Sequence, residues 1–412
     1  MNKDSYTIQK FCRICNNTNL IEVLSLGNQY LSGIFPKTKN EPLISAPLAL
    51  VKCIGKDSCG LVQMKYNFSS DIMYGENYGY RSGLNSSMVK HLENKTEKIK
   101  SIIDLENDDI ILDIGSNDGT TLSFFKNSNL NLIGIDPTAN NFIDYYPEEV
   151  SVVPNFFSSK LFTDKYKSKK AKVIFSLSMF YDLPKPLDFM REIKSILDVN
   201  GIWVVEQSYL PFMLESNSYD TVCHEHYEYY SLKDIKNMTD KLNLKIVDIE
   251  FNDINGGSFS LLISHNNENF IEYKNINNLL KKETYLDNLN TFETFKKNID
   301  TAKDDIQKKL SNLVKNGHSI AGIGASTKGN VMLQYCNINT SLIECIGEVN
   351  KEKLGCFTPG TNIPIISEDD VINKYEYLLV IPWHFRDFFL KNKKFKGKKL
   401  IFALPEVQII EV

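Results

Sequence analysis

A strand, a glycine turn and a helix follow one another in the first third of the chain, and this succession restricts the fold more than any other feature. The apolar run 110–114 is followed by Gly115, and the turn 116–119 leads into a predicted helix. A second apolar run, 130–135, ends in Asp136, about twenty residues after Gly115. Consecutive βα units of this kind form a doubly wound parallel sheet that binds a nucleotide at the carboxyl ends of its strands. We therefore expect a Rossmann-like α/β domain in the centre of the chain.

The polar residues of this unit indicate which nucleotide it binds. The glycines lack the G-x-G-x-x-G spacing of a dinucleotide site, and Asp113 precedes Gly115 by two residues. A carboxylate there suits a ligand with cationic groups, such as the ammonium and sulfonium of S-adenosylmethionine, and Asp136 can accept hydrogen bonds from ribose hydroxyls. An NAD-binding domain and a structural layer without a ligand are the alternatives. The residues predicted to bind S-adenosylmethionine are Asp113, Gly115, Ser116, Asn117, Asp118, Gly119, Asp136 and Pro137.

Four of the eight cysteines lie near the N-terminus, namely Cys12, Cys15, Cys53 and Cys59. In a C-x-x-C knuckle two thiolates bind one metal ion from a single tight turn, and a second pair completes a tetrahedral zinc site. The second pair is spaced more widely than usual, but it is still close enough for one ion. We expect a structural zinc ion; four ordinary thiols in a small α+β segment, or a redox pair, are the alternatives.

The segment 220–230 contains two of the six histidines, His224 and His226, on either side of Glu225. Histidine titrates near neutrality and is the usual general base, and a neighbouring carboxylate can orient its ring. In an extended segment the two histidines would share one face and Glu225 would point the other way. A general base is therefore expected here, with a buried polar cluster or a metal site as alternatives.

An aromatic-rich segment, 74–83, precedes the central domain. Two interpretations are open. Tyr78, Tyr80 and Arg81 either reach the substrate from a lid, or they belong to a turn that packs two domains together.

A second α/β unit follows a linker of one long or two shorter amphipathic helices at 279–313. In the segment 319–330 a short strand, a turn of small residues and a helix succeed one another, and strands are expected at 342–347, 377–382 and 400–403. Amides at a helix N-terminus with a lysine beside them can bind an anion. We expect a substrate diphosphate there, with purely structural turns as the alternative. The residues concerned are Gly324, Ser326, Lys328 and Asn330.

In this order, these motifs resemble the deoxysugar C-methyltransferases, a family that acts on nucleotide-activated 4-keto sugars. The cysteine pairs look like its zinc-binding domain, and the S-N-D-G turn at 116–119 with G-I-D-P at 134–137 looks like its S-adenosylmethionine site. The H-E-H triplet matches at 224–226, and the C-terminal domain matches at 322–330 and 359–361. Two positions depart from the family: Cys223 stands where an aromatic residue is usual, and 180–184 lacks a histidine.

The resemblance implies three domains: a zinc-binding domain at 1–75, a methyltransferase domain at 76–265, and a linker helix with a Rossmann-like nucleotide-sugar-binding domain at 266–412. It implies that His226 is the base, that Glu225 is also in the active site, and that Tyr78 and Tyr80 line the pocket. The expected reaction is methylation of a carbon of a nucleotide-activated keto-deoxysugar through an enolate. The alternatives are O-methylation of a sugar hydroxyl, a non-catalytic nucleotide-sugar-binding protein, and a nicotinamide-dependent oxidoreductase.

Composition and charge indicate which partners and which cellular location to expect. Hydrophobic residues make up 42% and charged residues 24%, which is typical of a globular protein, and the net charge of −4 argues against a nucleic-acid partner. There is no apolar run of about 18 residues and no apolar N-terminal signal. We therefore expect a cytoplasmic monomer or weak homo-oligomer that binds a nucleotide sugar and neither nucleic acid nor a membrane.

Overall fold

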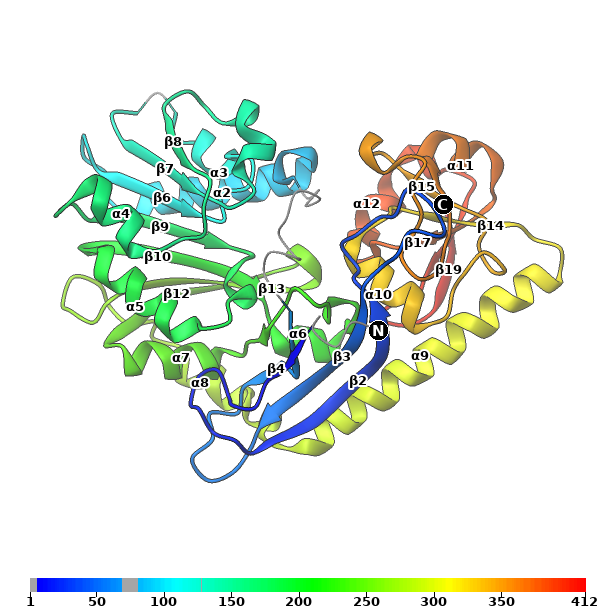
Figure 1. Ribbon diagram of the computed structural model, residues 1–412, viewed down its shortest axis with the longest axis horizontal. Helices are drawn as coiled ribbons and strands as arrows, with labels where there is room; N and C mark the ends of the chain where they lie inside the picture. Colours follow the sequence, from blue (N-terminus) through cyan, green and yellow to red (C-terminus); the bar gives the residue numbers. More distant parts are fainter. Residues whose placement is uncertain (1–5, 69–80, 127) are drawn as a thin grey trace.

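Four β-sheets and their surrounding helices make up the part of the chain that the computed structural model describes, residues 6–68, 81–126 and 128–412 (Figure 1). Two large sheets are covered by helices and form α/β domains, while a smaller sheet lies between them. None of the helices in these ranges is long and apolar enough to cross a membrane. The expected α/β fold class with three units is therefore confirmed.

The central domain is built on a seven-stranded sheet with the order β12-β13-β10-β9-β6-β7-β8. Its first five strands in the chain pair in parallel, as predicted, whereas β13 and β12 form an antiparallel edge that the βα pattern did not predict. The strands are β6 (Ile110–Ile114), β7 (Asn131–Ile135), β8 (Val150–Val153), β9 (Ala171–Leu177), β10 (Leu197–Ser208), β12 (Leu244–Asn252) and β13 (Ser258–His265). The helices are α2 (Ser86–Ile102), α3 (Thr120–Ser123), α4 (Ser159–Tyr166), α5 (Pro186–Ile196), α6 (Leu210–Glu215) and α7 (Leu232–Lys241).

Local sequence explains these elements. All five residues of β6 are buried, as expected for a central parallel strand covered on both faces. Helix α5 begins with Pro186, which suits a first helical turn, and it buries Phe189, Met190, Ile193 and Ile196 on one face. Helix α3 begins at Thr120, close to the predicted start, and is short, because turn-forming serine and asparagine residues follow it closely in the sequence.

The small N-terminal sheet has the order β11-β4-β3-β2. Strands β2 (Leu20–Tyr30), β3 (Ser45–Cys53) and β4 (Val62–Met64) come from the cysteine-containing segment, but β11 (Glu228–Tyr229) directly follows the H-E-H triplet. A pair of short strands, β1 (Thr7–Ile8) and β5 (Tyr66–Asn67), flanks the sheet. The triplet is therefore joined to the N-terminal sheet as well as to the central domain.

The C-terminal domain has a six-stranded sheet, parallel except for its last strand, with the order β16-β15-β14-β17-β18-β19. Its strands are β14 (Ile320–Ile323), β15 (Ile346–Glu348), β16 (Ile365–Ser367), β17 (Tyr377–Val380), β18 (Lys399–Phe402) and β19 (Gln408–Glu411). Its helices are α10 (Thr327–Tyr335), α11 (Glu368–Lys374) and α12 (Arg386–Lys391). The strand expected at 342–347 is shorter and begins only at Ile346.

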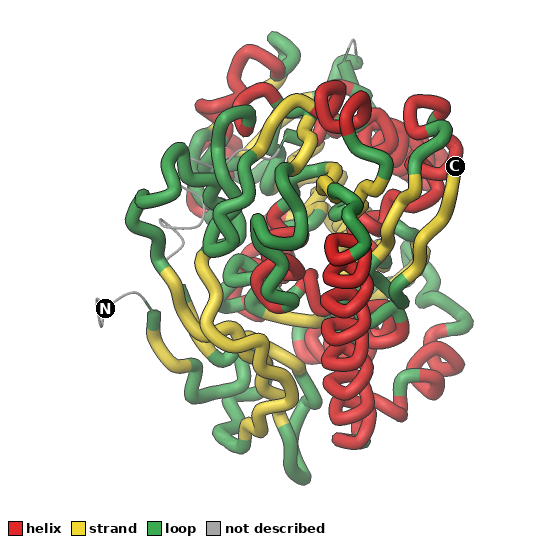
Figure 2. The backbone as a smooth tube through the Cα atoms, turned by 90° about the vertical axis from the view of Figure 1, so that its right-hand side faces the viewer, coloured by secondary structure: helices red, strands yellow, loops and turns green. Residues whose placement is uncertain are grey.

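The linker consists of two helices, α8 (Ile276–Lys282) and α9 (Leu289–Lys315). The sequence left open one long helix or two shorter ones; the structure has two, of which α9 is long. Apolar residues of α9 at three- and four-residue steps are buried, from Phe292 to Leu310. Figure 2 shows α9 as one straight helix that lies beside strands of two sheets, and it contacts both β2 and β14. The linker helix α9 therefore packs against both the N-terminal sheet and the C-terminal domain.

The N-terminal segment also docks directly on the C-terminal domain. The side-chain amide of Asn330, in α10, donates to the Ser32 carbonyl at 2.7 Å. The Tyr30 backbone amide donates to the side-chain oxygen of Gln334 at 2.7 Å. Farther along, the Phe357 amide donates to the Pro36 carbonyl at 2.8 Å. Asn330 thus serves a domain contact, which is not the diphosphate contact expected from the sequence.

Candidate active site and metal centre

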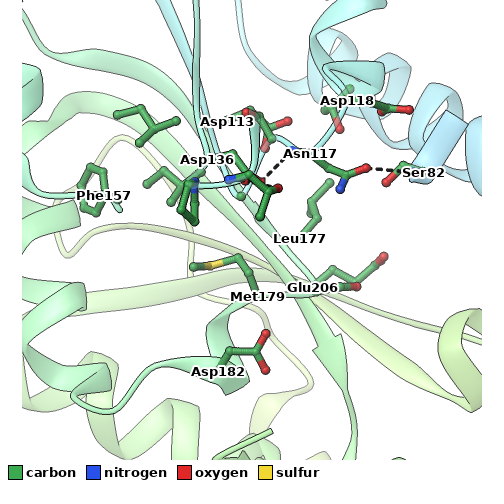
Figure 3. Close-up of a pocket in the computed structure, with 18 of the residues that line it drawn as sticks. Ser82, Asp113, Asn117, Asp118, Asp136, Phe157, Leu177, Met179, Asp182 and Glu206 are labelled. Atoms are coloured by element: carbon green, nitrogen blue, oxygen red, sulfur yellow. Dashed lines mark hydrogen bonds between the residues drawn. The ribbon is translucent and has the colours of Figure 1, made fainter. Parts of the chain in front are cut away.

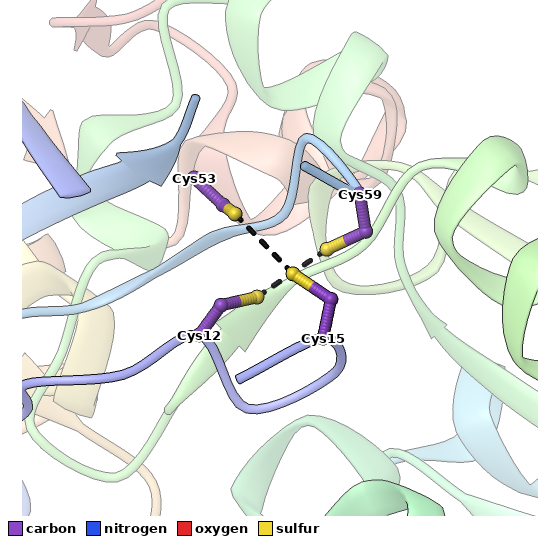
Figure 4. A group of neighbouring side chains, drawn as sticks. All are labelled: Cys12, Cys15, Cys53 and Cys59. Atoms are coloured by element: carbon purple, nitrogen blue, oxygen red, sulfur yellow. Dashed lines mark hydrogen bonds between the residues drawn. The ribbon is translucent and has the colours of Figure 1, made fainter. Parts of the chain in front are cut away.

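The four N-terminal cysteines converge on one point (Figure 4). Their sulfur atoms all lie within 4.8 Å of one another, with 3.3 Å between Cys12 and Cys59 and 3.5 Å between Cys15 and Cys53. A tetrahedral Zn²⁺ with bonds of about 2.3 Å needs its sulfur ligands about 3.8 Å apart, so this set fits zinc.

The backbone holds these thiols in place before any ion is considered. The knuckle is closed by the Cys12 amide, which donates to the Asn17 carbonyl at 2.8 Å, and Cys53 is the last residue of β3. The hydrogen bond with Cys59 lowers the pKa of the Cys12 thiol to about 5, while burial raises that of Cys53 to about 12. A closed set of four thiolates leaves no open position, so the ion would be structural.

A cavity of about 390 Å³ opens at the carboxyl ends of β6, β7 and β9 (Figure 3). All eight residues predicted to bind the cofactor lie in or beside it, and all except Gly119 contribute to its lining. Gly115 turns the chain with a φ of +74°, and a Cβ atom there would approach the Met179 side chain to 3.0 Å. The glycine therefore serves the sharp turn and the close packing at the cavity wall.

Asp136 is held rigidly at the end of β7. One carboxylate oxygen accepts from the Asn117 amide at 2.9 Å, and the other accepts from the amide and hydroxyl of Thr138, both at 2.6 Å. Since an ionised carboxylate has about four lone-pair positions, capacity remains for ribose hydroxyls. Burial and the charge of Asp136 raise the pKa of Asp113 to about 7, so this cavity is short of positive charge. That deficit fits a cationic ligand.

Asp118 lines the cofactor cavity and also makes structural contacts, and Arg81 lies beside it. Asp118 accepts from the Thr120 amide and hydroxyl and from the Gly83 amide, so it joins α3 to the turn η1 (Ser82–Leu84). The Arg81 guanidinium lies 3.6 Å from Asp118 and stacks over the Tyr145 ring at 3.8 Å. Arg81 therefore stands at the cofactor cavity. Tyr78 and Tyr80 lie outside the described residues.

Glu206 is a cavity residue that the sequence reasoning missed. It ends the core of β10 and is held by His91 at 2.6 Å, Lys95 at 2.8 Å and Asn252 at 2.9 Å. Although burial opposes ionisation, the hydrogen bond from His91 and the charge of Lys95 lower the pKa of Glu206. The signal that identified Asp136, an acid at the end of a predicted strand, was present here too.

The H-E-H triplet forms a turn, so the extended geometry expected from its alternation is wrong. The His226 backbone amide donates to the Cys223 carbonyl at 3.2 Å, which closes the turn and separates the two histidines. His224 is fully buried and packs edge-on against Phe68 of the N-terminal segment, with ring centroids 4.8 Å apart. Burial lowers the pKa of His224 to about 4.

His226 instead faces the cofactor side of the turn. Its Nδ1 lies 2.9 Å from the Thr221 carbonyl, and its ring lies 4.2 Å from that of Tyr181, in the turn η3 (Phe180–Asp182) beside the cavity. A carbonyl only accepts, so Nδ1 carries the proton and Nε2 has the lone pair. Burial, and then the charge of Lys328, lower the pKa of His226 to about 3, which keeps the ring neutral near pH 7.

Glu225 points toward the N-terminal segment at Gly33. A Cβ atom on Gly33 would lie 2.8 Å from the Glu225 Oε1, so the glycine leaves the space that this carboxylate occupies. Burial raises the pKa of Glu225. Of the predicted catalytic residues, His226 contacts Tyr181, whose neighbour Asp182 lines the cofactor cavity, while Glu225 is directed toward Gly33 and His224 packs on Phe68.

The predicted diphosphate turn of the C-terminal domain is largely satisfied internally. The Ala325 amide donates to Glu348 at 2.8 Å, and the Gly329 amide donates to the Ser326 side chain at 3.0 Å, which caps α10. Lys328 donates to the Asn255 carbonyl of the central domain at 2.6 Å. Gly324 has a φ of +82° and packs against Pro382. Lys328 therefore lies at a domain boundary, and the diphosphate site expected from the sequence stays a prediction.

Together, the parallel sheet, its carboxylate-rich cavity and the four-cysteine centre define a methyltransferase with a zinc-binding domain. Family models support each part: residues 12–74 match "Putative zinc binding domain", 88–249 match "Methyltransferase domain" and 253–405 match "C-methyltransferase C-terminal domain". These three matches, in this order, show a C-methyltransferase with a zinc-binding domain, a methyltransferase domain and a C-terminal C-methyltransferase domain.

Individual known proteins are similar to this chain over different shares of its length. The C-methyltransferase NovU of Streptomyces niveus is 24% identical over 410 residues, covering 97% of this chain and 96% of that protein. Among solved structures, the LepI complex with SAM covers 41% of this chain and 46% of that chain, with 15% identity and a TM-score of 0.35. The plantazolicin methyltransferase BpumL in complex with SAH covers 42% of this chain and 82% of that chain, with 14% identity and a TM-score of 0.33.

Proposed function

We propose that this C-methyltransferase methylates a carbon next to the ketone of a nucleotide-activated keto-deoxysugar, with His226 as the general base. The observation that carries the proposal is the geometry of His226. Its Nδ1 donates to the Thr221 carbonyl, and its ring packs on Tyr181 at the edge of the cofactor cavity. A proton acceptor therefore stands beside the site from which a methyl group would be delivered.

The chain's own residues account for the proton step. A ketone acidifies the adjacent C–H bond, because the electrons of that bond can move onto the ketone oxygen. His226 Nε2 takes the proton and becomes an imidazolium, Thr221 holds the ring in place, and the carboxylate of Glu225 favours the resulting positive charge. S-adenosylmethionine, when bound, supplies the electrophilic methyl group. Tyr78 and Tyr80 remain the predicted donors to the enolate oxygen.

The sugar nucleotide is proposed from the resemblance, together with the match of residues 253–405 to the C-terminal domain of C-methyltransferases. The nucleotide would bind on the C-terminal domain, in contact with the N-terminal segment that docks there. We keep the prediction of a cytoplasmic monomer or weak oligomer, since nucleotide-activated sugars are soluble small molecules.

The test combines methyl transfer with solvent exchange. Purified protein is first titrated with S-adenosylhomocysteine and then with nucleoside diphosphates, and a matching panel of keto-deoxysugars is assayed for methylated product. Without methyl donor, the enzyme is expected to exchange the hydrogen of the ring carbon for solvent deuterium. An O-methyltransferase would not exchange that hydrogen, and a binding protein would give no product.

Variants test the base. His226→Asn is expected to lower both exchange and methylation by at least about 100-fold, which is the scale of general-base catalysis. His318→Asn is the matched control, because this ring packs on Tyr377 in the C-terminal domain, far from the triplet in the fold. Methylation at the wild-type rate by His226→Asn would refute the assignment.

A further inference from the structure

The turn η4 (Tyr219–Thr221) lies between the base and the C-terminal domain. On one side, the Thr221 carbonyl accepts from His226. On the other, Tyr219 packs on Tyr335 of α10 with ring centroids 4.9 Å apart, and its hydroxyl lies 3.0 Å from the Cys336 sulfur. Helix α10 lies on the side of the C-terminal domain that faces the central domain (Figure 1). The turn that accepts a hydrogen bond from His226 is therefore packed against another domain.

Asp220, the middle residue of η4, is bound from the C-terminal domain too. Its Oδ2 accepts from the indole N–H of Trp383 at 2.9 Å, in the turn η8 (Trp383–Phe385). Its Oδ1 is buried and has no hydrogen-bond partner among the described residues. Burial raises the pKa of Asp220, and the largest opposing influence is the charge of Lys328. A buried carboxylate of this kind needs a nearby cation.

Lys328, in the first turn of α10, links three parts of the active site. Its ammonium donates to the backbone carbonyl of Asn255 at 2.6 Å. The side-chain amide of Asn255 in turn donates at 3.1 Å to the hydroxyl of Ser178, which lines the cofactor cavity. An ammonium has three donors, and the charge of this one acts on Asp220 and on His226. The lysine thus contacts the segment beside the cofactor wall, and its charge acts on the η4 turn and on His226.

We propose that Lys328 is a positioning residue for the base, supplied across the domain boundary by the C-terminal domain. It holds Asn255 by a hydrogen bond and supplies, from the helix that packs on η4, the positive charge that the buried carboxylate of this turn requires, and so stabilises the turn whose carbonyl orients His226. The inference rests on the proposed role of His226 as base, and it replaces a diphosphate contact as the role of Lys328.

The surroundings of His226 agree with this role. The groups in contact with its ring are the Tyr181 ring from η3 and the Thr221 carbonyl from η4, and the charge of Lys328 acts on it from α10. Lys328 also lowers the pKa of His384 in η8, after burial. The charge of Lys328 therefore acts on groups of both η8 and the H-E-H turn.

The test compares Lys328→Met and Lys328→Arg with Lys353→Met. Lys353 is a matched control, because it is also a partly buried lysine of the C-terminal domain that donates to a carbonyl, that of Ala325, at 2.8 Å. Hydrogen exchange is measured by mass spectrometry on the full-length protein, over the peptide 219–226. Its amides at Tyr219, Thr221, Val222 and His226 are hydrogen-bonded in the structure and report on the turn.

We expect Lys328→Met to speed exchange in this peptide at least about tenfold, and Lys328→Arg and Lys353→Met to leave it within about threefold of wild type. Unchanged exchange in Lys328→Met, or an equal effect of Lys353→Met, would overturn the proposal. In the methylation assay, Lys328→Met should lower kcat at least about tenfold with KM nearly unchanged. A selective rise in KM would instead restore the diphosphate role. If wild type methylates no sugar, the proposed function fails while the exchange result still decides the positioning role.

Discussion

Asp113 is expected to make the affinity of the cofactor cavity depend on pH. Burial, and then the charge of Asp136, raise its pKa to about 7 in the ligand-free protein. A ligand whose ammonium group binds this carboxylate requires it to be deprotonated, so affinity is present above pH 7 and is lost as the pH falls below it. Between pH 8 and pH 6 the deprotonated fraction falls from about nine tenths to about one tenth. Affinity should therefore drop about tenfold, or about 1.4 kcal/mol.

Calorimetric titration with S-adenosylhomocysteine at pH 6, 7 and 8 measures this directly. Asp113→Asn should bind more weakly and show no such dependence, which also corrects for any titration of the ligand itself. Asp104→Asn is the control, because this exposed carboxylate lies between α2 and β6 and outside the cavity. A wild-type Kd that stays within twofold from pH 6 to pH 8 would refute the role of Asp113.

Three further predictions concern other parts of the site. Gly33→Ala places a methyl group 2.8 Å from Glu225 and should lower turnover about 100-fold with little change in Tm; unchanged turnover would contradict the placement of Glu225. Cys59→Ser should abolish stoichiometric zinc binding and lower Tm by at least about 5 °C, and full zinc content in this variant would exclude the four-thiolate centre. Glu206→Gln leaves Lys95 buried without its partner, and denaturant unfolding should show a loss of about 3 kcal/mol; a loss below about 1 kcal/mol would contradict the pairing.

Structural features that depend on a single strand and the turn after it could be predicted from the sequence. The apolar run before Gly115 predicts a buried parallel strand, and topology then places the polar residues at its carboxyl end in the cavity. The same reasoning placed Asp136 correctly, and the C-x-x-C knuckle predicted the cysteine cluster because its ligands are fixed by a single turn. Glu206 could have been found in the same way, since it directly follows the apolar run 202–205.

Structural features that depend on pairing between segments distant in the sequence could not be predicted from it. Strand β11 has two residues, which is too short for any periodicity, and it forms only because β4 offers a partner edge. The alternation of His224 and His226 suggested an extended segment, yet the pairing of Tyr227 with Tyr181 and Met64 on either side leaves room only for a turn. Tertiary contacts decided the conformation here against a weak local pattern.

The C-terminal domain shows how a correct local reading can still assign a residue the wrong role. The strand, small turn and helix at 320–335 are present as predicted, and a lysine at the start of such a helix ordinarily suggests an anion. Nothing local shows that Asn330 contacts Ser32, 298 positions away, or that Lys328 contacts Asn255, 73 positions away. Those two contacts turn a helix N-terminus that would bind an anion into the surface on which the other domains meet. The proposed active site is therefore a property of the assembled chain: the central domain carries the proposed base, and the domains on both sides pack against the turn that contains it.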